Sequence, residues 1–381
     1  MKRKLKDILT RNRIWESIIR KEIRPSEWIQ TKTLGLGLIN LFLFAVLTVT
    51  GILLMFYYVP DTEKAYQSLK DLQYVISFGM ILRNMHRWSA YLMIVSVFLH
   101  FSRAFFMGEY QKPRQFNWVI GMLMLLCVLG MGNTGYLLPW DQKAYWGMTI
   151  LSNVISAVPV VGEHLKYLVL GGTEVGQNVL TRAFDMHVKV FPLVLGFLMG
   201  IHFWRIRIDD SLAEPVPPQG SQTPVGTNNS GGNNPRAQTA VGWSDIITRE
   251  ASKCLLVLAI VMGVSLLFNA PLEEIATPSV TPNPAKAPWF FLDLQEMLSW
   301  GPPFWWAIVV PNIAVLFLML IPYLDPGRTG SGQWFHPSRR VQNILFTAFV
   351  TVMIGLIVIG KFMRGPGWVF YWPWQPWPPS P

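Results

Sequence analysis

Residues 80–106 read MILRNMHRWSAYLMIVSVFLHFSRAFF, and residues 187–207 read HVKVFPLVLGFLMGIHFWRIR. Each stretch is long and apolar enough to cross a lipid bilayer as one α-helix. Each contains two histidines, which are His86 and His100 in the first stretch and His187 and His202 in the second. The first two are fourteen residues apart, a step that places the second imidazole roughly 21 Å along the helix on nearly the same face. Two such helices side by side would offer two pairs of facing imidazoles, which predicts two haems stacked across the membrane.

The composition indicates a protein that lies mostly inside a membrane. Of the 381 residues, 51% are hydrophobic and only 14% are charged, and the mean hydropathy is +0.32. These values exclude an ordinary soluble protein of this length. The two cysteines, Cys127 and Cys254, both lie in apolar stretches, so the chain has no disulfide framework and no C-x-x-C-H haem attachment motif. The net charge of +10 does not indicate nucleic-acid binding, because the basic residues flank apolar segments.

Apolar windows of about twenty residues mark seven expected transmembrane helices. We therefore expect an all-α integral membrane protein, in which a four-helix bundle carries two haems and a three-helix domain follows. The windows are 34–58, 80–106, 116–138, 188–206, 252–269, 304–323 and 342–361.

The segments between and around these helices predict the domain boundaries. The basic and apolar residues of the N-terminal segment alternate at near-helical spacing, which predicts an amphipathic helix on the membrane surface. A Pro-, Gly- and Asn-rich stretch after the fourth helix predicts a flexible linker, and a Trp- and Pro-rich tail predicts an interfacial anchor or subunit contact. The expected segments are 1–33 for the surface helix, 34–210 for the four-helix domain, 211–250 for the linker, 251–362 for the three-helix domain and 363–381 for the tail.

The distribution of basic residues predicts the orientation. With the N-terminus inside, the inner segments contain about 21 Lys and Arg and the outer segments about 8, and such an excess stays on the cytoplasmic side. We therefore expect a cytoplasmic N-terminus and an outer C-terminus. This orientation pairs His86 with His187 near the outer surface and His100 with His202 toward the inner surface. Each pair is expected to hold one haem.

Glycines recur at the same spacing as the histidines. Gly37 and Gly51 are fourteen residues apart in the first helix, and Gly121 and Gly135 are fourteen apart in the third. Glycine in a helix interior costs about 1 kcal/mol relative to alanine. The repeat therefore suggests that a flat group approaches the backbone at two depths.

Two features of the fourth helix and its borders complete the expected haem sites. His187 and His202 are fifteen residues apart, which adds about 100° of rotation on a regular helix. We expect Pro192, or a local bulge near it, to restore the facing of the two rings. Arginines near the membrane borders could bind haem propionates; the candidates are Arg83, Arg87, Arg205 and Arg207, with Arg87 preferred.

Five further stretches carry recognisable motifs, namely H-R-W-S-A at 86–90, H-x-x-R at 100–103, T-G-Y-L-L-P-W-D-Q at 134–142, A-Y-W-G at 144–147 and V-G-Q-N-V-L-T-R at 175–182. Together they resemble the cytochrome b family of quinol-oxidising Rieske/cytochrome b complexes, and most closely its cytochrome b6 branch. The resemblance is nearly continuous from 30 to 208. Residues 250–362 resemble in length and helix count subunit IV, which is a separate chain in the chloroplast-type complex.

This resemblance implies the cytochrome b subunit of a quinol:cytochrome c oxidoreductase in an energy-transducing bacterial membrane. It implies two non-covalent b-type haems, bound quinone, a Rieske-type iron–sulfur protein, a c-type cytochrome and a homodimeric complex, with electron transfer coupled to proton translocation. One alternative is the dihaem membrane anchor of a quinone-linked dehydrogenase, which would not bifurcate electrons. A second is a haem-free transporter whose histidines form a proton path. The 134–142 motif and the three-helix second half favour the quinol:cytochrome c oxidoreductase over the dihaem anchor.

The expected outer quinol site departs from the family pattern. The family carries a Pro-Glu-Trp-Tyr motif there, whose Glu is thought to bind quinol and accept a proton, whereas residues 287–290 read Ala-Pro-Trp-Phe. Pro288 therefore occupies the Glu position. The resemblance implies an aromatic pocket lined by Tyr136, Pro139, Trp140, Trp146, Trp289 and Phe290. Quinol oxidation needs a base, and the candidate proton acceptors are Glu273, Glu274, Asp293 and Glu296.

A second departure concerns covalent haem. The b6 branch attaches an extra c-type haem through a cysteine two residues before the position of Gly37, where this chain has Gly35. A thioether bond cannot form at a glycine. We therefore expect no covalently bound haem on this chain.

Overall fold

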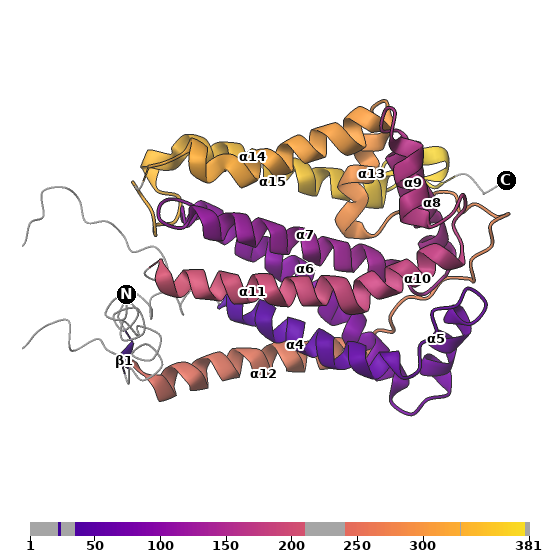
Figure 1. Cartoon of the computed structure of the whole chain (residues 1–381), viewed down its shortest axis with the longest axis horizontal. Helices are drawn as coiled ribbons and strands as arrows, with labels where there is room; N and C mark the ends of the chain where they lie inside the picture. The colour runs from indigo at the N-terminus through magenta and orange to yellow at the C-terminus, as the bar shows by residue number, and fades with distance from the viewer. Residues whose placement is uncertain (1–21, 24–34, 210–240, 328, 378–381) are drawn as a thin grey trace, which may run out of the picture.

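The computed structural model describes residues 22–23, 35–209, 241–327 and 329–377. Within these ranges the chain is almost entirely helical, and its long helices run side by side (Figure 1). Two short strands, β1 (Glu22–Ile23) and β2 (Val241–Gly242), pair in an antiparallel manner. The expected all-α architecture is confirmed.

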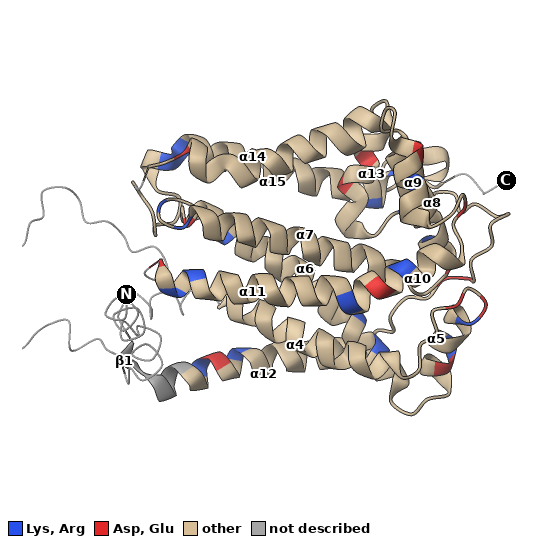
Figure 2. Ribbon diagram, viewed as in Figure 1, with Lys and Arg blue, Asp and Glu red and all other residues tan. Residues whose placement is uncertain are grey.

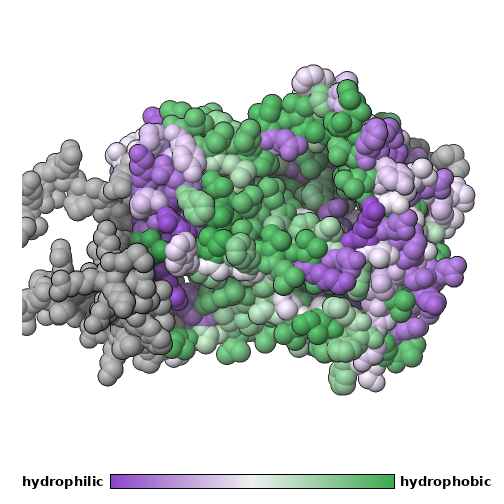
Figure 3. Space-filling view, viewed as in Figure 1, coloured by the Kyte–Doolittle hydropathy of each residue, from purple (hydrophilic) through white to green (hydrophobic). Residues whose placement is uncertain are grey.

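Seven helical spans in the described residues are long and apolar enough to cross a membrane, one at each expected position. Charged residues gather toward the two ends of the bundle (Figure 2), and apolar side chains cover the band between them (Figure 3). The chain is therefore an integral membrane protein. The spans are α4 (Leu36–Met55), α6 (Gly79–Phe106), α7 (Gln115–Leu137), α10 (Gln177–Asp185) continued by η1 (Met186–Val190) and α11 (Phe191–Ile208), α12 (Trp243–Leu267), η4 (Phe304–Val309) with α14 (Val310–Leu324), and η5 (Pro337–Arg339) with α15 (Arg340–Val358) and η6 (Ile359–Met363).

Several short helices lie at the right-hand end of the bundle in Figure 1, which we call the α8 end. Asp141 begins α8 by accepting the backbone N–H of Ala144 at 2.9 Å, as an N-cap residue does. A search for long apolar windows does not find these helices, because they are too short or too polar. They are α5 (Ala65–Tyr74), α8 (Gln142–Ser156), α9 (Gly162–Leu170), η3 (Trp289–Phe291), α13 (Leu292–Leu298) and η7 (Pro366–Trp368).

Two expected segments differ from the structure or lie outside it. Helix α12 begins at Trp243, so residues 243–250 are helical and do not belong to the expected linker; hydropathy had marked only the apolar part of this helix. The rest of the expected linker, 211–240, lies outside the described residues. The expected surface helix 1–33 also lies outside them, except for Glu22–Ile23, which forms strand β1.

Each helix with a glycine pair packs against a helix that carries histidines: α4 packs on α6, and α7 packs on α11. A buried apolar layer fills the middle of this bundle. In each helix one member of the layer lies near the midpoint in sequence between the two histidines or the two glycines. The layer therefore separates two histidine levels, which we call the upper level (His86 and His187) and the lower level (His100 and His202). The members of the layer in these four helices are Leu43, Leu47, Met93, Ile94, Val128 and Leu195.

Hydrogen bonds from α6 hold the second half of the chain at the α8 end. Arg83 donates to the carbonyl oxygens of Ala270 at 2.8 Å and Pro271 at 2.7 Å. The adjacent Asn84 donates to the carbonyl of Ser265 at 2.8 Å and accepts the backbone N–H of Ala270 at 2.8 Å. These bonds fix the loop after α12 against the helix that carries His86.

A buried arginine joins the two halves at the opposite end of the bundle. Arg339, which is 2% exposed, donates to the carbonyl of Phe105 at 2.6 Å and to that of Phe106 at 3.2 Å. Gly108 has φ +65°, and a Cβ atom there would lie 2.6 Å from Nη1 of Arg339. A glycine is thus needed both for the left-handed turn and for the approach of the guanidinium.

Candidate functional site

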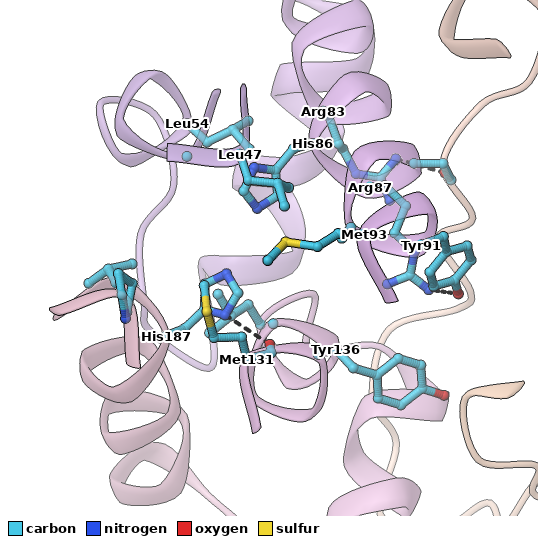
Figure 4. Close-up of a pocket in the computed structure, with 18 of the residues that line it drawn as sticks. Leu47, Leu54, Arg83, His86, Arg87, Tyr91, Met93, Met131, Tyr136 and His187 are labelled. Carbon is cyan, nitrogen blue, oxygen red and sulfur yellow. Dashed lines mark hydrogen bonds between the residues drawn. The ribbon is translucent and has the colours of Figure 1, made fainter. Parts of the chain in front are cut away.

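The upper histidine level brings two imidazoles opposite each other across the bundle. The ring centroids of His86 and His187 lie 6.1 Å apart, and the ring planes are inclined by 71° (Figure 4). If one nitrogen of each ring bound a single metal ion at about 2 Å, the centroids would be roughly 6 Å apart. The separation therefore fits one iron held between the two rings.

The other ring nitrogen of each histidine is already hydrogen-bonded. The hydroxyl of Thr50 donates to the carbonyl of Val46 at 2.8 Å, so it can accept a bond from Nδ1 of His86, which lies 2.9 Å away. Nδ1 of His187 lies 3.0 Å from the carbonyl of Met131 and can donate to it. Metal-binding histidines generally donate their second N–H in this way. Each ring thus keeps Nε2 available for iron.

Glycines bring the backbone against these two rings. A Cβ atom on Gly51 would lie 3.2 Å from Cε1 of His86, and one on Gly135 would lie 2.6 Å from Cε1 of His187. Contacts below about 3 Å require a rearrangement. The two glycines therefore keep a space open beside the two rings. A larger residue would fill this space, which a flat group held by the rings would need.

The lower level repeats this arrangement with fewer partners. Gly37 faces His100, and Gly121 faces His202, with Cβ positions 3.6 Å and 4.0 Å from the respective Cε1 atoms. His100 and His202 are close enough to interact electrostatically. Nδ1 of each ring is buried without a hydrogen-bond partner. The structure thus brings together the residues of both expected haem sites, each with a glycine at its ring.

A π-helical turn accounts for the fifteen-residue spacing. It spans Met186–Val190, contains His187 and directly precedes Phe191 and Pro192. A π-turn inserts one extra residue into an α-helix, so fifteen residues here rotate the chain about as far as fourteen do in a regular helix. This is the bulge expected near Pro192, and it faces both rings of the helix toward α6.

A cavity of about 240 Å³ lies beside the upper level and extends toward the α8 end. In addition to His86 and His187, it is lined by Gly51, Gly135, Thr48 and many apolar residues. Its remaining polar side chains come from two arginines and three tyrosines, which are Arg83, Arg87, Tyr58, Tyr91 and Tyr136. Four of these five are labelled in Figure 4.

The candidate propionate ligands differ in their surroundings. Arg87 lies on the cavity, and its Nε atom is buried without a hydrogen-bond partner. Arg83 also lies on the cavity, but its terminal nitrogens donate to the loop after α12. At the other end, Arg205 donates to Asp209 at 2.6 Å, whereas Arg207 is exposed near the end of α11. Arg87 is thus the best placed of the upper arginines to hold an anionic group.

The expected quinol-site residues divide between two neighbouring cavities. Tyr136, Pro139 and Phe290 line the 240 Å³ cavity. Trp146 lines a second cavity of about 310 Å³, formed by α8, the loop 282–287 and Lys361. Trp289 begins η3, and its ring lies roughly perpendicular to that of Tyr91 at a centroid distance of 6.0 Å. The remaining residue, Trp140, is buried in an apolar cluster that includes Ala144 and Met148 of α8.

The four candidate proton acceptors have unequal environments. Glu273 is ion-paired with Lys143 on the second cavity, and Glu274 is exposed. Glu296 is buried and accepts two hydrogen bonds from Nε of Arg364 at 3.0 and 3.1 Å. Asp293 is 5% exposed, and its Oδ1 atom has no hydrogen-bond partner. Burial raises the pKa of Asp293 to about 6.

The structure also adds two residues that the sequence analysis did not identify. Tyr91 lies between Arg87 and the segment after Pro288, and Thr50 lies beside His86. Tyr91 follows Arg87 by four residues on α6, a spacing that places both on one helix face. That spacing is the one sequence signal that could have identified Tyr91.

Position 35 is closed off by the second half of the chain. Gly35 has φ +64° and begins α4. A Cβ atom there would lie 2.8 Å from Oε2 of Glu250 and 3.1 Å from Nζ of Lys253. A side chain at this position would therefore be strained by the positive φ, and the ends of the Glu250 and Lys253 side chains would have to shift.

Family models match both halves of the chain. Residues 22–209 match the model described as Cytochrome b/b6/petB, and residues 275–372 match the model described as Cytochrome b(C-terminal)/b6/petD. The first model covers the four-helix part of the chain, and the second covers the residues that follow α12.

Individual proteins show the same similarity. A cytochrome b6 of Prochlorococcus marinus (strain MIT 9303) is 42% identical over 172 residues, which are 45% of this chain and 79% of that protein. The menaquinol:cytochrome c reductase cytochrome b subunit of Geobacillus thermodenitrificans is 39% identical over 199 residues, 51% of this chain and 89% of that protein. A chain of the solved "Hyperthermophilic respiratory Complex III" matches with a TM-score of 0.72 and 26% identity, covering 86% of this chain and 83% of that one.

Proposed function

Because the chain belongs to the cytochrome b/b6 family, we propose that it is the cytochrome b subunit of a quinol:cytochrome c oxidoreductase. The proposal includes two non-covalent b haems, an outer and an inner quinone site, and coupling of electron transfer to proton translocation. The Geobacillus relative, whose name specifies menaquinol:cytochrome c reductase, supports this activity. The similarity to a respiratory Complex III chain supports it further.

The observation that carries the proposal is the arrangement of His86 and His187. Their rings are 6.1 Å apart, and Nδ1 of each has a hydrogen-bond acceptor within 3.0 Å. Among the described residues, no group of three or more His, Cys, Asp or Glu side chains could hold a metal ion without a prosthetic group. Two imidazoles suit a haem, which supplies the remaining iron ligands itself. We propose that His100 and His202 hold the second haem in the same way.

The proposed haems would accept and release one electron at a time between the two quinone sites. The chain contributes the ligands, the glycine-lined space and the apolar layer that keeps the levels apart. We assign Arg87 to the propionates of the upper haem and Arg207 to the inner quinone site. Arg83 would face the same cavity as Arg87 while its terminal nitrogens hold the loop after α12. Tyr136, Trp289 and Phe290 would enclose quinol at the outer site, with Glu273 and Glu274 as more distant carboxylates.

The proposed orientation places the α8 end at the outer surface. The excess of Lys and Arg on the opposite side supports this orientation. The two halves of the chain would then correspond to a dihaem domain, 34–210, and a three-helix domain whose first helix, α12, begins at Trp243. Partners in the assembly would be a Rieske-type iron–sulfur protein, a c-type cytochrome and a second copy of the chain.

The proposal is tested on the purified complex by adding quinol and then oxidising the c-type partner. An electron-bifurcating enzyme shows extra reduction of its b haems when its other acceptor is oxidised. We expect this extra reduction, and we expect outer-site quinol analogues to abolish it. If the b haems are reduced by quinol but oxidant has no such effect, the chain is a dihaem anchor and the proposal is wrong.

Paired variants test the ligand assignment in the same preparation. His100→Leu should remove the absorbance of one b haem, because that iron would lose an axial ligand. The matched control is His164→Leu, which changes an exposed histidine on α9 and should retain both haems. Retention of both haems in His100→Leu would show that the lower site is held by other residues.

A further inference from the structure

We propose that the phenol oxygen of Tyr91, held in place by Arg87, accepts the hydrogen bond of the quinol hydroxyl at the outer site. Tyr91 would thereby bind and orient the substrate where Pro288 cannot provide a carboxylate. This inference rests on the proposed function, because it concerns the same quinol site. It assigns a role to a residue that neither motif nor haem spacing selects.

The first argument is the chemistry of the cavity wall. No aspartate or glutamate is among the described residues that line the 240 Å³ cavity. Glu273 lies on the neighbouring cavity, and Glu296 is paired with Arg364. Apart from Thr48 and the two histidines proposed to bind the haem, the polar side chains that line this cavity are phenols and guanidinium groups. The haem would occupy the part of the cavity between His86 and His187, so a quinol at the wall formed by Tyr91, Tyr136 and Phe290 meets hydroxyl oxygens as its available side-chain acceptors.

The second argument is the geometry of Tyr91 itself. Nη2 of Arg87 donates to the hydroxyl oxygen of Tyr91 at 2.6 Å, and the guanidinium carbon lies 4.6 Å from the centre of the Tyr91 ring (Figure 4). Both contacts fix the phenol in one orientation. A phenol oxygen has two acceptor lone pairs, so the bond from Arg87 leaves one lone pair for a ligand hydroxyl.

The third argument is the position of the Tyr91 ring. It lies roughly perpendicular to the ring of Trp289, at a centroid distance of 6.0 Å, and to that of Phe290, at 6.3 Å. These are the two residues after Pro288, the position at which the family carries its Glu. The ring of Tyr91 thus connects the cavity to the segment that lacks a carboxylate.

A second unsatisfied hydroxyl lies on the same cavity. The hydroxyl oxygen of Tyr136 is buried without a hydrogen-bond partner, and the guanidinium of Arg87 lies 5.9 Å from the centre of its ring. Buried polar atoms normally have partners, so this oxygen indicates a ligand that completes the site. Arg87 lies near both tyrosine rings, which keeps the three groups in one cluster on the cavity.

The direct test is Tyr91→Phe in the assembled complex. The substitution keeps the ring contacts with Trp289 and Phe290 and removes only the oxygen. One lost hydrogen bond to the substrate corresponds to roughly a tenfold loss of affinity. We therefore expect the KM for a soluble naphthoquinol to rise about tenfold, with both haem spectra and both potentials unchanged.

The matched control is Tyr74→Phe, which removes the hydroxyl of a tyrosine that is 76% exposed on α5. It should leave KM and kcat at their wild-type values. An unchanged KM in Tyr91→Phe would overturn the inference. A wild-type complex that shows no oxidant-induced reduction of b haems would instead overturn the proposed function, so the two failures are distinguishable.

A ligand comparison separates hydrogen bonding from packing. The methyl ether of the same naphthoquinol lacks the hydroxyl that Tyr91 would accept from. As a competitive inhibitor it should bind wild type about tenfold more weakly than the parent quinol, and this difference should disappear in Tyr91→Phe. If the difference persists in the variant, Tyr91 does not receive that hydrogen bond and the inference is wrong.

Discussion

Gly135 lies directly against the imidazole of His187, so that a Cβ atom on this glycine would be 2.6 Å from Cε1 of the ring. The contact is between the backbone of α7 at Gly135 and the side chain of His187. Moving either group would disturb α7 or the π-turn that carries His187. A methyl group at this position would push the imidazole away from the place where it faces His86. The glycine repeat is therefore tied to the histidine repeat by contact as well as by spacing.

Gly135→Ala should consequently lose the haem of the upper level. We expect its b-haem content to fall to about half of the wild-type value, measured as haem per chain by a pyridine haemochrome assay. Gly263→Ala is the matched control, because a Cβ atom there meets nothing within 4 Å. Full haem content in Gly135→Ala would contradict the role of this glycine.

Burial of Asp293 predicts a pH-dependent loss of stability. Its pKa is raised to about 6 in the folded chain, compared with about 3.9 in an unfolded one. The protonated form is therefore favoured by folding, and this contribution is complete below pH ~4 and is lost as pH rises through about 6. Asp293→Asn, which resembles the protonated acid, should be more stable than wild type above that pH by up to about 3 kcal/mol.

The measurement is the midpoint of thermal denaturation of the detergent-solubilised complex at several pH values. Wild type should lose stability relative to Asp293→Asn between pH ~4 and pH ~7. Glu174→Gln, at an exposed carboxylate, should follow wild type at every pH. Parallel pH curves for wild type and Asp293→Asn would contradict the raised pKa.

Arg339 should be among the most costly residues to replace in the second half of the chain. Its side chain is 2% exposed and donates to two carbonyls of α6 and to Tyr110. Arg339→Met would leave these buried acceptors unsatisfied and should destabilise the fold by about 3–5 kcal/mol. The neighbouring Arg340→Met, at an exposed position, should cost less than about 0.5 kcal/mol. Equal denaturation midpoints for the two variants would contradict this role.

The chain should carry no covalently attached haem. Gly35 offers no thiol, and the carboxylate of Glu250 lies 2.8 Å from the point where a Cβ atom would be. A haem stain after denaturing electrophoresis should therefore show no band at the mass of the chain, 43.4 kDa. A stained band at that mass would contradict the prediction.

The membrane spans and the histidine pairs could be predicted from local sequence. A span is a run of about twenty apolar residues, and a haem pair is a fixed step along a helix, so both depend on residues close together in the chain. The π-turn at His187 could be predicted for the same reason, because an irregular spacing must be compensated within one helix.

The acid–base environment of the quinol site could not be predicted in this way. Glu296 and Arg364 are 68 residues apart in sequence, and their ion pair exists only because α13 packs beside the end of η6. Asp293, Glu273 and Glu274 look alike in sequence, yet only Asp293 among them is buried. Such differences arise from tertiary packing, which charge and spacing do not report.

The central claim is that four histidines hold two haems at two levels, and a redox titration of the purified complex tests it most directly. The titration follows the b-type absorbance as the potential is lowered. The account predicts two one-electron components of equal amplitude, of which His187→Leu loses one and His202→Leu loses the other. A single component in wild type, or loss of the same component in both variants, would contradict the claim.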